Sequence, residues 1–561
     1  MAGITRRGAL FTGISFMGAS ATACSDTNLG ESVDYPVEFV HGVASGDPGT
    51  DRMVIWTRIT AGTDGTIPVR IPVKWEMSTD AEFRKIRSKG ETSTSAARDY
   101  TVKVDATGLK PGTAYYYRFK VGQHVSPVGR TKTLPVGSVA EARFAVVSCS
   151  NFPFGYFNVY DHIAQQDEFD AVIHLGDYFY EYGVDSYGGR TGRRLGRNHE
   201  PPHETVTLGD YRTRHAQYKA DAASQAMHAA HPIISIWDDH ETANDSWQTG
   251  AQNHNEGEGS WDTRRGAAMQ AYYEYMPVRD PEPGKAREAL FRDFSFGDLL
   301  SLHTLETRLT ARTRPLSYEQ YAETLTTKEA IADFVKNILW DPAREMLGAG
   351  QKDWLAKSLK ASKDAGTGWR LIANQVLLGP VLSPDLTDYA GSEAIERIAQ
   401  FRPSIRKTIK FSPLGLPISL DSWDGYPAAR ERFYALAQEQ GVQGLLVLTG
   451  DTHVSRVNSL KTKSGQSMGV EFGVTGTTSP GHDAFFKDIT QDYEKRLTSK
   501  NKDMHWIQSG ERGYLDLHIT REQAQANFIS ISTTHAKDYT TFTAKSFSIA
   551  KDGESLKLGD S

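Results

Sequence analysis

Residues 171–180 read AVIHLGDYFY, an apolar run that ends in glycine, aspartate and tyrosine. Four other apolar runs also end in residues of metal-binding types: FAVVSCSN (144–151), IISIWDDHE (233–241), LIANQ (371–375) and LLVLTGDTH (445–453). Continuous apolar runs of this length are typical of strands buried on both faces of a sheet. Open α/β sheets bind their ligands outside the carboxyl ends of such strands. If the five strands share a sheet, their ends form one metal-binding crevice, which indicates a metallohydrolase.

The length and local patterns predict two domains. A chain of 561 residues exceeds the usual size of one hydrophobic core. Residues 35–134 contain short strand-like runs between Gly, Pro, Asp and Thr clusters, which predicts a β-sandwich. Within them, LKPGTAY (109–115) resembles the tyrosine corner of fibronectin type III-like sandwiches. Strands alternate with helical stretches from 142 to 549, which predicts an α/β catalytic domain.

Composition argues against one class of partner. Hydrophobic residues make up 39% of the chain and charged residues 24%, which is ordinary for a globular protein. The net charge of −6 argues against nucleic acid as a bulk electrostatic partner, although local basic patches stay possible. One such patch is the Arg-rich loop around 190–197, which either meets an anionic substrate or is a solvated loop.

The N-terminus indicates export. Arg6 and Arg7 form a twin arginine before a weakly apolar stretch, and residues 21–23 have the small-x-small form of a cleavage site. We therefore interpret residues 1–23 as a twin-arginine signal peptide, which implies the twin-arginine export machinery as a partner and a periplasmic or extracellular location. A chance arginine pair is the alternative. Cys24 follows the cleavage site, so a lipid anchor there stays open.

The strand ends supply the ligands that phosphate ester hydrolysis needs. Two nearby cations can share a bridging carboxylate, polarise phosphoryl oxygens and make hydroxide from water. Asp177 is the candidate bridge. Tyr180 and Cys149 indicate Fe³⁺ at one position, because tyrosinate and thiolate are strong donors to ferric iron. Oxygen ligands suit Ca²⁺, Mg²⁺ or Mn²⁺ at the other position. The candidates for it are Asp239, Asn374 and Asp451, and His453 adds an imidazole.

These motifs resemble the calcineurin-like metallophosphoesterases, and closely the PhoD-type alkaline phosphatases. The matching stretches are VASGDP (43–48), LGDYFYEY (175–182), IWDDHE (236–241), DSWDGY (421–426) and LTGDTHV (448–454). The resemblance runs from about residue 35 to about residue 549. It implies a four-layer α/β/β/α metallophosphoesterase domain after the small β-sandwich. It also implies phosphomonoesterase activity with some phosphodiesterase activity.

The resemblance also implies a set of ligands for each metal position. The ferric ion would take Cys149, Asp177, Tyr180 and His453, and the calcium position would take Asp177, Asp239, Asn374 and Asp451. Gln375 is an alternative to Asn374, because sequence does not fix the strand register. His240 matches a histidine near the leaving group, so it is expected to stabilise phosphate or protonate the leaving group. Asp238 and Glu241 are expected to orient ligands, and Asp424 and His174 to be structural.

The sequence is compatible with three functions. The first is an exported phosphatase that acts on small phosphate esters. The second keeps the fold but hydrolyses phosphodiesters, including lipid headgroups, in the manner of a phospholipase D. The third is a non-enzymatic surface protein whose strand-end acids are incidental, which five coincident motifs disfavour. The natural substrate and the oligomeric state are not determined by the sequence.

Overall fold

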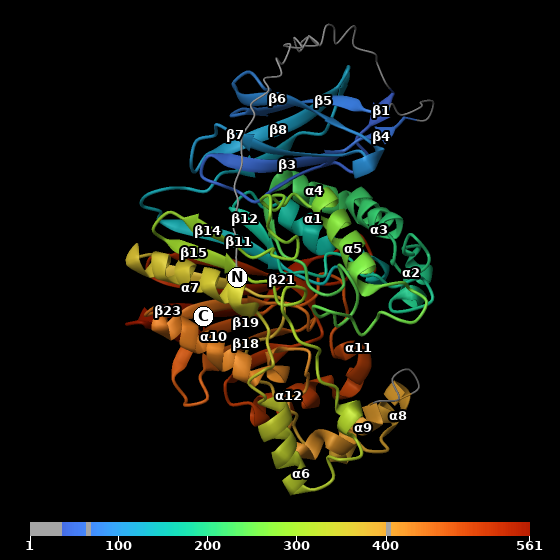
Figure 1. Ribbon diagram of the computed structural model, residues 1–561, viewed down its shortest axis with the longest axis vertical. Coiled ribbons are helices and arrows are strands. Elements are labelled where there is room, and N and C mark those ends of the chain that lie inside the picture. The colour runs from blue at the N-terminus through green and yellow to red at the C-terminus, as the bar shows by residue number, and fades with distance from the viewer. Residues whose placement is uncertain (1–35, 63–68, 400–404, 561) are drawn as a thin grey trace, which may run out of the picture.

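The computed structural model describes residues 36–62, 69–399 and 405–560. The predicted signal peptide at 1–23 and Cys24 lie outside the described residues. Figure 1 shows a small β-rich unit at one end, a layered central body and a helical lobe at the other end. Within the described ranges, no helix is both long and apolar enough to span a bilayer.

The central body contains two sheets that face each other. The larger has ten strands in the order β24 (Ser555–Asp560), β23 (Thr541–Asp552), β22 (Gln523–Ile531), β21 (Arg512–Thr520), β11 (Glu141–Val147), β12 (Ala171–His174), β13 (Pro232–Ser235), β2 (Val43–Gly46), β3 (Arg52–Arg58) and β7 (Thr101–Thr107). The smaller has seven strands in the order β14 (Arg292–Phe296), β15 (Leu300–Thr304), β16 (Trp369–Ala373), β17 (Leu445–Thr449), β19 (Ser467–Gly473), β18 (Ser455–Lys461) and β20 (Met504–Gln508). The strands of the five quoted sequence runs are parallel within their sheets: β11, β12 and β13 in one, and β16 and β17 in the other. They therefore belong to two facing sheets rather than to one.

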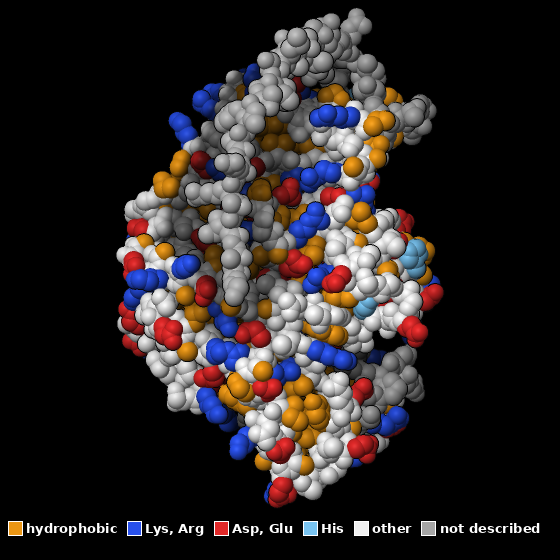
Figure 2. Space-filling model, in the orientation of Figure 1, with side chains coloured by type: hydrophobic (Ala, Val, Ile, Leu, Met, Phe, Trp, Pro, Cys, Tyr) orange, Lys and Arg blue, Asp and Glu red, His pale blue; other side chains and the backbone are white. Residues whose placement is uncertain are grey.

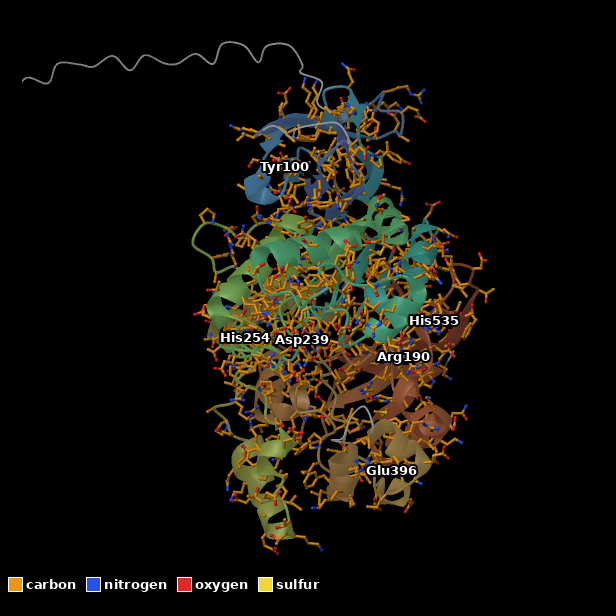
Figure 3. All side chains as sticks on the ribbon, turned by 90° about the vertical axis from the view of Figure 1, so that its right-hand side faces the viewer. Tyr100, Arg190, Asp239, His254, Glu396 and His535 are labelled. Atoms are coloured by element: carbon orange, nitrogen blue, oxygen red, sulfur yellow. The ribbon has the colours of Figure 1, made fainter. Side chains whose placement is uncertain are left out.

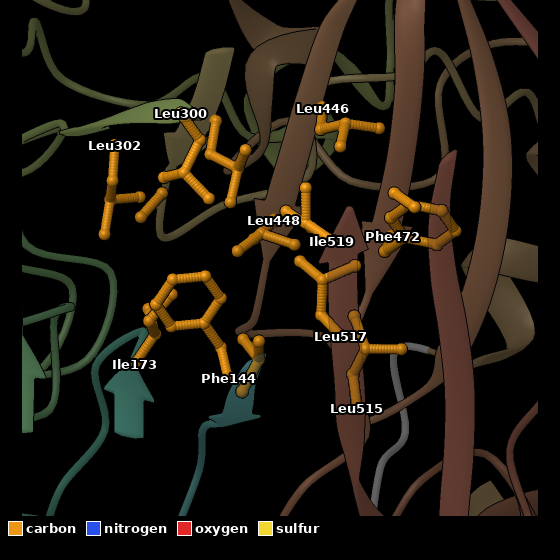
Figure 4. Close-up of a cluster of buried hydrophobic side chains, with 14 of the residues drawn as sticks. Phe144, Ile173, Leu300, Leu302, Leu446, Leu448, Phe472, Leu515, Leu517 and Ile519 are labelled. Carbon is orange, nitrogen blue, oxygen red and sulfur yellow. The ribbon is translucent and has the colours of Figure 1, made fainter. Parts of the chain in front are cut away.

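A hydrophobic core fills the space between the sheets. Phe144 of β11 packs edge-to-face on Phe296 of β14, with ring centroids 5.0 Å apart. Leucines from both sheets surround this pair and are fully buried, including Leu302, Leu448 and Leu517 (Figure 4). Each such side chain contributes about 1.5–3 kcal/mol relative to an exposed one. Burial on both faces is the reason that these strands appear in the sequence as unbroken apolar runs.

Helices cover the outer face of each sheet. The ten-stranded sheet packs against α1 (Asn158–Ala164), α3 (Leu208–Ala220), α4 (Ala222–Ala230) and α5 (Trp261–Tyr275). The seven-stranded sheet packs against α7 (Gly348–Asp364) and α10 (Pro427–Glu439). The predicted four-layer α/β/β/α order is confirmed (Figure 1). Local signals set the helix ends: Thr207 and Asp210 form a capping box at α3, and Asp221 caps α4.

The N-terminal unit is a β-sandwich. One layer consists of β10 (Gly129–Lys132), β8 (Ala114–Val121), β5 (Ile71–Ser78) and β6 (Ile86–Thr94), with β9 (His124–Val125) beside β8. A separate pair consists of β1 (Val37–Glu38) and β4 (Thr60–Ala61). The tyrosine corner is present, because the Lys110 N–H donates to the Tyr115 hydroxyl at 2.8 Å. The second layer is β2, β3 and β7, and β2 pairs in parallel with β13 of the central body. One sheet thus runs across the predicted domain boundary.

The lower lobe is built from segments that are distant in sequence. It contains 3₁₀ helices, a π-helix and short α-helices: η3 (Tyr318–Tyr321), α6 (Lys328–Asp333), η4 (Phe334–Leu339), η5 (Thr387–Tyr389), α8 (Glu393–Ala399), α9 (Ile405–Phe411), η6 (Ser412–Leu414), α11 (Asp483–Phe486), η8 (Lys487–Ile489) and α12 (Thr490–Lys500). The Arg-rich loop contains a further short helix, α2 (Gly189–Leu195). Sequence patterns did not predict this lobe, because its helices are short and its apolar residues join clusters across long sequence separations.

Candidate metal centre

The candidate metal ligands lie in tight turns directly after the strands. Cys149, Asp177, Asp451 and His453 all have positive φ angles, of 59°, 54°, 63° and 57°. Non-glycine residues rarely adopt this conformation, and such residues are often found at functional sites. Gly176 makes the turn after β12 possible, because its φ is 105° and a Cβ there would lie 2.5 Å from the Asp238 backbone nitrogen. The turns after β12 and β13, two neighbouring strands of the larger sheet, therefore meet closely.

The first group of ligand-type residues consists of Cys149, Asp177 and His453, with one donor atom of each within 4.8 Å of the others. Tyr180 joins the group, because its hydroxyl donates to Asp177 Oδ2 at 3.0 Å and lies 2.9 Å from His453 Nε2. The Ser479 hydroxyl donates to the same tyrosine oxygen at 2.8 Å. The structure thus brings together all four residues that the resemblance assigns to iron.

Histidine 453 is held with one nitrogen toward this group. Its Nδ1 lies 3.0 Å from the Pro480 carbonyl oxygen, to which it can only donate. In the neutral ring that tautomer leaves Nε2 with its lone pair, as a metal ligand requires. Burial lowers the pKa of this imidazole to about 3, so the ring is neutral near pH 7.

The second group consists of Asp238, Asp239 and Asp451, again with donor atoms within 4.8 Å. Asp177 connects the groups, because it also lies within 4.8 Å of Asp239 and His240. This position is the one that a bridging carboxylate needs. The Asp451 side chain is 24% exposed, so the centre is accessible to solvent beside it. Figure 3 shows Asp239 between His254 and Arg190, above the lobe that carries Glu396.

Arg308 is a member of the site that sequence analysis missed. Its fully buried guanidinium pairs with Asp238 at 2.5 Å, Asp421 at 2.7 Å and Asp451 at 3.2 Å. It also lies 3.6 Å from Asp239. One cation therefore compensates several buried carboxylates. The sequence did contain a signal for Arg308, because this residue follows β15, which is a sixth strand that ends in polar residues.

The donor set fits bound cations. Asp177 Oδ1 and Asp238 Oδ2 are buried and have no hydrogen-bond partner among the described residues. Burial raises the pKa values of Cys149, Asp177 and Tyr180 well above their ordinary ranges. Such groups are costly to ionise without a positive charge, and a bound cation supplies one. Thiolate and phenolate donors on one side and carboxylates on the other are the ligand types expected at the two predicted positions.

His240 is fixed by a residue that sequence analysis also missed. Its Nδ1 lies 2.7 Å from Glu181 Oε2, and its ring lies over that of Tyr180 with centroids 4.1 Å apart. Glu181 also accepts the backbone N–H of Asn244 at 2.8 Å. Burial disfavours the charged imidazole, but the negative charges of Asp239 and Glu181 outweigh it and raise the pKa well above the ordinary value. Because Nδ1 is bound to Glu181, Nε2 is the ring nitrogen that remains to act at the centre.

The amides at 374 and 375 are used differently. The Gln375 side chain accepts from the Thr307 hydroxyl at 2.6 Å and donates to the Leu305 carbonyl at 2.7 Å, so both of its ends are engaged. Asn374 donates to the Val376 carbonyl, and its Oδ1 accepts the Trp423 indole N–H at 3.4 Å. Asn374 follows β16, which pairs in parallel with β17, and Asp451 lies in the turn after β17. The Asn374 amide oxygen is only weakly engaged. The geometry favours Asn374 as the ligand.

The expected supporting residues have distinct roles. Glu241 accepts the backbone N–H groups of Asp177, Tyr178 and Asp238, at 3.1, 2.6 and 2.8 Å, and so ties two strand ends together. Asp238 contributes to the second group through Arg308, closer to the centre than expected. His174 contacts the Tyr160 hydroxyl at 2.8 Å, and Asp424 pairs with Arg430 at 2.6 Å. His174 and Asp424 therefore stabilise the structure around the site, as expected.

The Arg-rich loop is partly engaged in structural contacts. Arg193 donates to the Val184 carbonyl at 2.7 Å and pairs with Asp185 at 3.1 Å. Arg197 is buried and pairs with Asp221 at 2.9 Å. Arg194 also has a contact, because its Nη2 lies 3.3 Å from His535 Nδ1. These contacts engage three of the four arginines, so Arg190 is the first candidate for a substrate role.

The four-layer fold and this cluster define the class of protein as a metallophosphoesterase-type hydrolase. Comparison with known proteins gives the family. Residues 144–528 match the model of the PhoD-like phosphatases, and residues 24–135 match that family's N-terminal domain. The chain is 35% identical over 534 residues to alkaline phosphatase D of Bacillus subtilis (strain 168). The aligned stretch covers 93% of this chain and 82% of that protein.

A solved structure agrees with the sequence comparisons. The structure described as that of PhoD superposes with a TM-score of 0.74 at 33% identity, covering 95% of this chain and 94% of that one. The chain belongs to the PhoD-like phosphatase family and is a phosphoric ester hydrolase. The resemblance seen in the sequence is confirmed.

Proposed function

We propose that this protein is an exported, metal-dependent alkaline phosphatase that hydrolyses small phosphate monoesters and, to a lesser extent, phosphodiesters. The observation that carries the proposal is the buried Asp177 oxygen, which no described residue hydrogen-bonds and which lies between a Cys–Tyr–His group and a carboxylate group. Two cations there would polarise the phosphoryl oxygens and lower the pKa of water.

The grouping of donor atoms supports the ligand sets that the resemblance implies for the two cations. Cys149, Asp177, Tyr180 and His453 would hold Fe³⁺. Asp177, Asp239, Asn374 and Asp451 would hold Ca²⁺, with Mg²⁺ or Mn²⁺ as substitutes. Arg308 keeps the carboxylates of the second group together and limits their mutual repulsion.

His240 is the proposed catalytic residue. Glu181 binds its Nδ1, which fixes the ring and leaves Nε2 as the nitrogen that can act at the centre. From there Nε2 can donate a hydrogen bond to a phosphoryl oxygen or a proton to the leaving group. The ring face against Tyr180 restricts the imidazole to this orientation.

Export by the twin-arginine route is part of the proposal. Arg6, Arg7 and the small residues at 21–23 support it. This route carries folded proteins, which suits an enzyme that binds its metals before it leaves the cytoplasm. Replacing both arginines with lysine should retain the protein in the cytoplasm. Unchanged export of that variant would argue for a different route.

The deciding experiment is elemental analysis of the exported protein together with hydrolysis of a simple aryl phosphate, with and without added Ca²⁺. Near-stoichiometric iron, a visible tyrosinate-to-iron absorption and calcium-dependent turnover are expected. Zinc or manganese in place of iron would contradict the Cys149–Tyr180 assignment while keeping the phosphoesterase. A bis-phosphodiester assayed in parallel measures the phosphodiesterase activity relative to the phosphomonoesterase activity.

A further inference from the structure

The segment between β19 and α11 lies against the Cys–Tyr–His group. The Ser479 N–H donates to the Cys149 carbonyl at 3.3 Å, and the Ser479 hydroxyl donates to the Tyr180 oxygen at 2.8 Å. The next residue, Pro480, presents its carbonyl oxygen to His453 Nδ1 at 3.0 Å. Two consecutive residues of this segment therefore contact three of the four candidate iron ligands.

Other contacts fix the segment itself. Arg512 of β21 donates to the Ser479 carbonyl at 2.7 Å and pairs with Asp483 at 2.9 Å. The Thr478 hydroxyl accepts the backbone N–H of Asn151 at 2.7 Å. These bonds attach the segment both to β21 and to the chain that follows β11. The Ser479 hydroxyl therefore has a defined position relative to Tyr180.

Both partners of the serine–tyrosine hydrogen bond are removed from solvent. Charged side chains of both signs are spread over the face shown in Figure 2, whereas Ser479 and Tyr180 are each 0% exposed. A hydrogen bond in such an interior is electrostatically stronger than one in water. Among the described residues, Tyr180 is the sole hydrogen-bond partner of the Ser479 hydroxyl.

The direction of this bond matters for a tyrosine that binds a cation. The Tyr180 hydroxyl donates its own proton to Asp177 Oδ2 at 3.0 Å. A phenolate ligand has lost that proton, so its oxygen can only accept hydrogen bonds. Ser479 supplies the proton of its own bond and can therefore keep donating to the same oxygen when a metal is bound.

We propose that Ser479 is a positioning residue for the ferric ion: its hydroxyl holds the Tyr180 oxygen in place and reduces the charge that this oxygen donates to the metal. The inference rests on the proposed function, because it assumes iron at the Cys–Tyr–His group. Hydrogen bonds to a metal ligand orient that ligand and tune the metal, and their loss typically costs about 10–100-fold in metal affinity or activity.

Ser479→Ala removes the donor without adding volume. In the protein loaded with iron and calcium, the tyrosinate-to-iron absorption should move to longer wavelength, because a phenolate without this hydrogen bond donates more charge to the ferric ion. Iron affinity, measured by competition with a chelator, should fall by about tenfold or more. An absorption maximum and an iron affinity equal to those of the unaltered protein would overturn the inference.

Ser301→Ala is the matched control for a lost buried hydroxyl. Ser301 of β15 is 4% exposed, and its hydroxyl lies 2.9 Å from that of Ser362 and 3.0 Å from His303 Nε2. The absorption maximum and iron affinity of S301A should equal those of the unaltered protein. Equal shifts in S301A and S479A would mean that the absorption responds to a general loosening of the interior, and the inference would fail.

A measurement on the unaltered protein does not depend on the folding of a variant. Resonance Raman spectra excited in the tyrosinate band are recorded for loaded protein prepared in H₂O and in D₂O. The carbon–oxygen stretch of Tyr180 should shift in D₂O, because deuterium replaces the proton that Ser479 donates. A stretch at the same frequency in both solvents would contradict the hydrogen bond.

The same spectra separate this inference from the proposed function. Loaded protein with no tyrosinate band would contradict the ferric assignment, and the inference would fall with it. Normal iron content and turnover, together with a band that S479A leaves unchanged, would contradict the role of Ser479 alone.

Discussion

At the scale of single residues, the centre depends on buried acids whose charges other groups compensate. Asp177 is 1% exposed, and one of its oxygens has no hydrogen-bond partner in the described part of the chain; Arg308 pairs with three further carboxylates. A buried charge costs several kcal/mol unless it is paired or binds a cation. Substitutions here separate the metal-binding role of a residue from its structural role.

Asp177→Asn keeps the side-chain shape but removes the bridging charge. We expect kcat to fall by roughly a hundredfold or more, because losing a bridge forfeits several kcal/mol of transition-state stabilisation. The unfolding midpoint of the metal-free protein should not fall, because burial already disfavours the ionised form of Asp177. Iron content, turnover and thermal unfolding measure these effects. Asp167→Asn, an exposed control, should change none of them, and full activity in D177N would refute the bridging role.

Arg308→Gln tests whether this arginine compensates the carboxylates. Removing it leaves buried acids unpaired, which should lower the free energy of unfolding by about 3–5 kcal/mol in metal-free protein. Added Ca²⁺ should restore part of the loss, because it supplies the missing positive charge. Thermal midpoints with chelator and with Ca²⁺ measure this.

Arg430→Gln is the control for the arginine variant. Arg430 pairs with Asp424, away from the metal groups. The Arg430→Gln substitution should lower the thermal midpoint by the same amount with and without Ca²⁺. If calcium changed the midpoints of the two variants by the same amount, Arg308 would have no special link to the metal position.

At the scale of elements, strand length and the turns after the strands position the ligands. The turn after β12 requires Gly176, whose φ of 105° and close approach to Asp238 exclude a side chain. Gly176→Ala should lower stability by at least about 1–3 kcal/mol and reduce bound iron, because the turn must move Asp177.

Gly108→Ala provides the matched control for that turn. Gly108 also has a positive φ, of 78°, but a Cβ there meets no atom within 4 Å. The Gly108→Ala variant should lose only the stability that an alanine with a positive φ costs, and its iron content should not change. Chemical denaturation and elemental analysis compare the two variants, and equal effects would mean that the contact with Asp238 does not matter.

At the scale of the whole molecule, the sandwich and the catalytic body share one sheet. β2 pairs with β13, and the Trp56 indole N–H donates to the Glu274 carbonyl at 2.7 Å across the same junction. A fragment of residues 136–561 would expose the edge of β13 and the apolar surface below it. We expect this fragment to aggregate, because exposed strand edges pair with other chains.

Gel filtration and near-ultraviolet circular dichroism test the fragment against residues 36–561. The longer chain should elute as one compact species with the tertiary signal of folded protein. A fragment that did the same would show that the catalytic body is an independent folding unit, despite the shared sheet.

The candidate site could be predicted from sequence where each candidate ligand follows a buried strand. Cys149, Asp177, Tyr180, Asp239 and His453 carry that signal, and the structure brings them together, while their metal binding stays a prediction. Arg308, Asp421 and Glu181 were missed, because an arginine or acid in a loop is usually exposed and nothing local indicates its partners. The choice of Asn374 over Gln375 required the hydrogen bonds of both amides.

The sequence by itself determined the buried strands, the helices between them, the tyrosine corner and the ligand types, because each depends on residues close together in the chain. Only the tertiary structure decided that the strands form two facing sheets, that β2 extends the larger one into the sandwich, and that Arg308 lies among the acids. It also decided the lower lobe and the contact of Ser479 with Tyr180. These features join segments up to hundreds of residues apart, and no local pattern specifies which distant segments pack together.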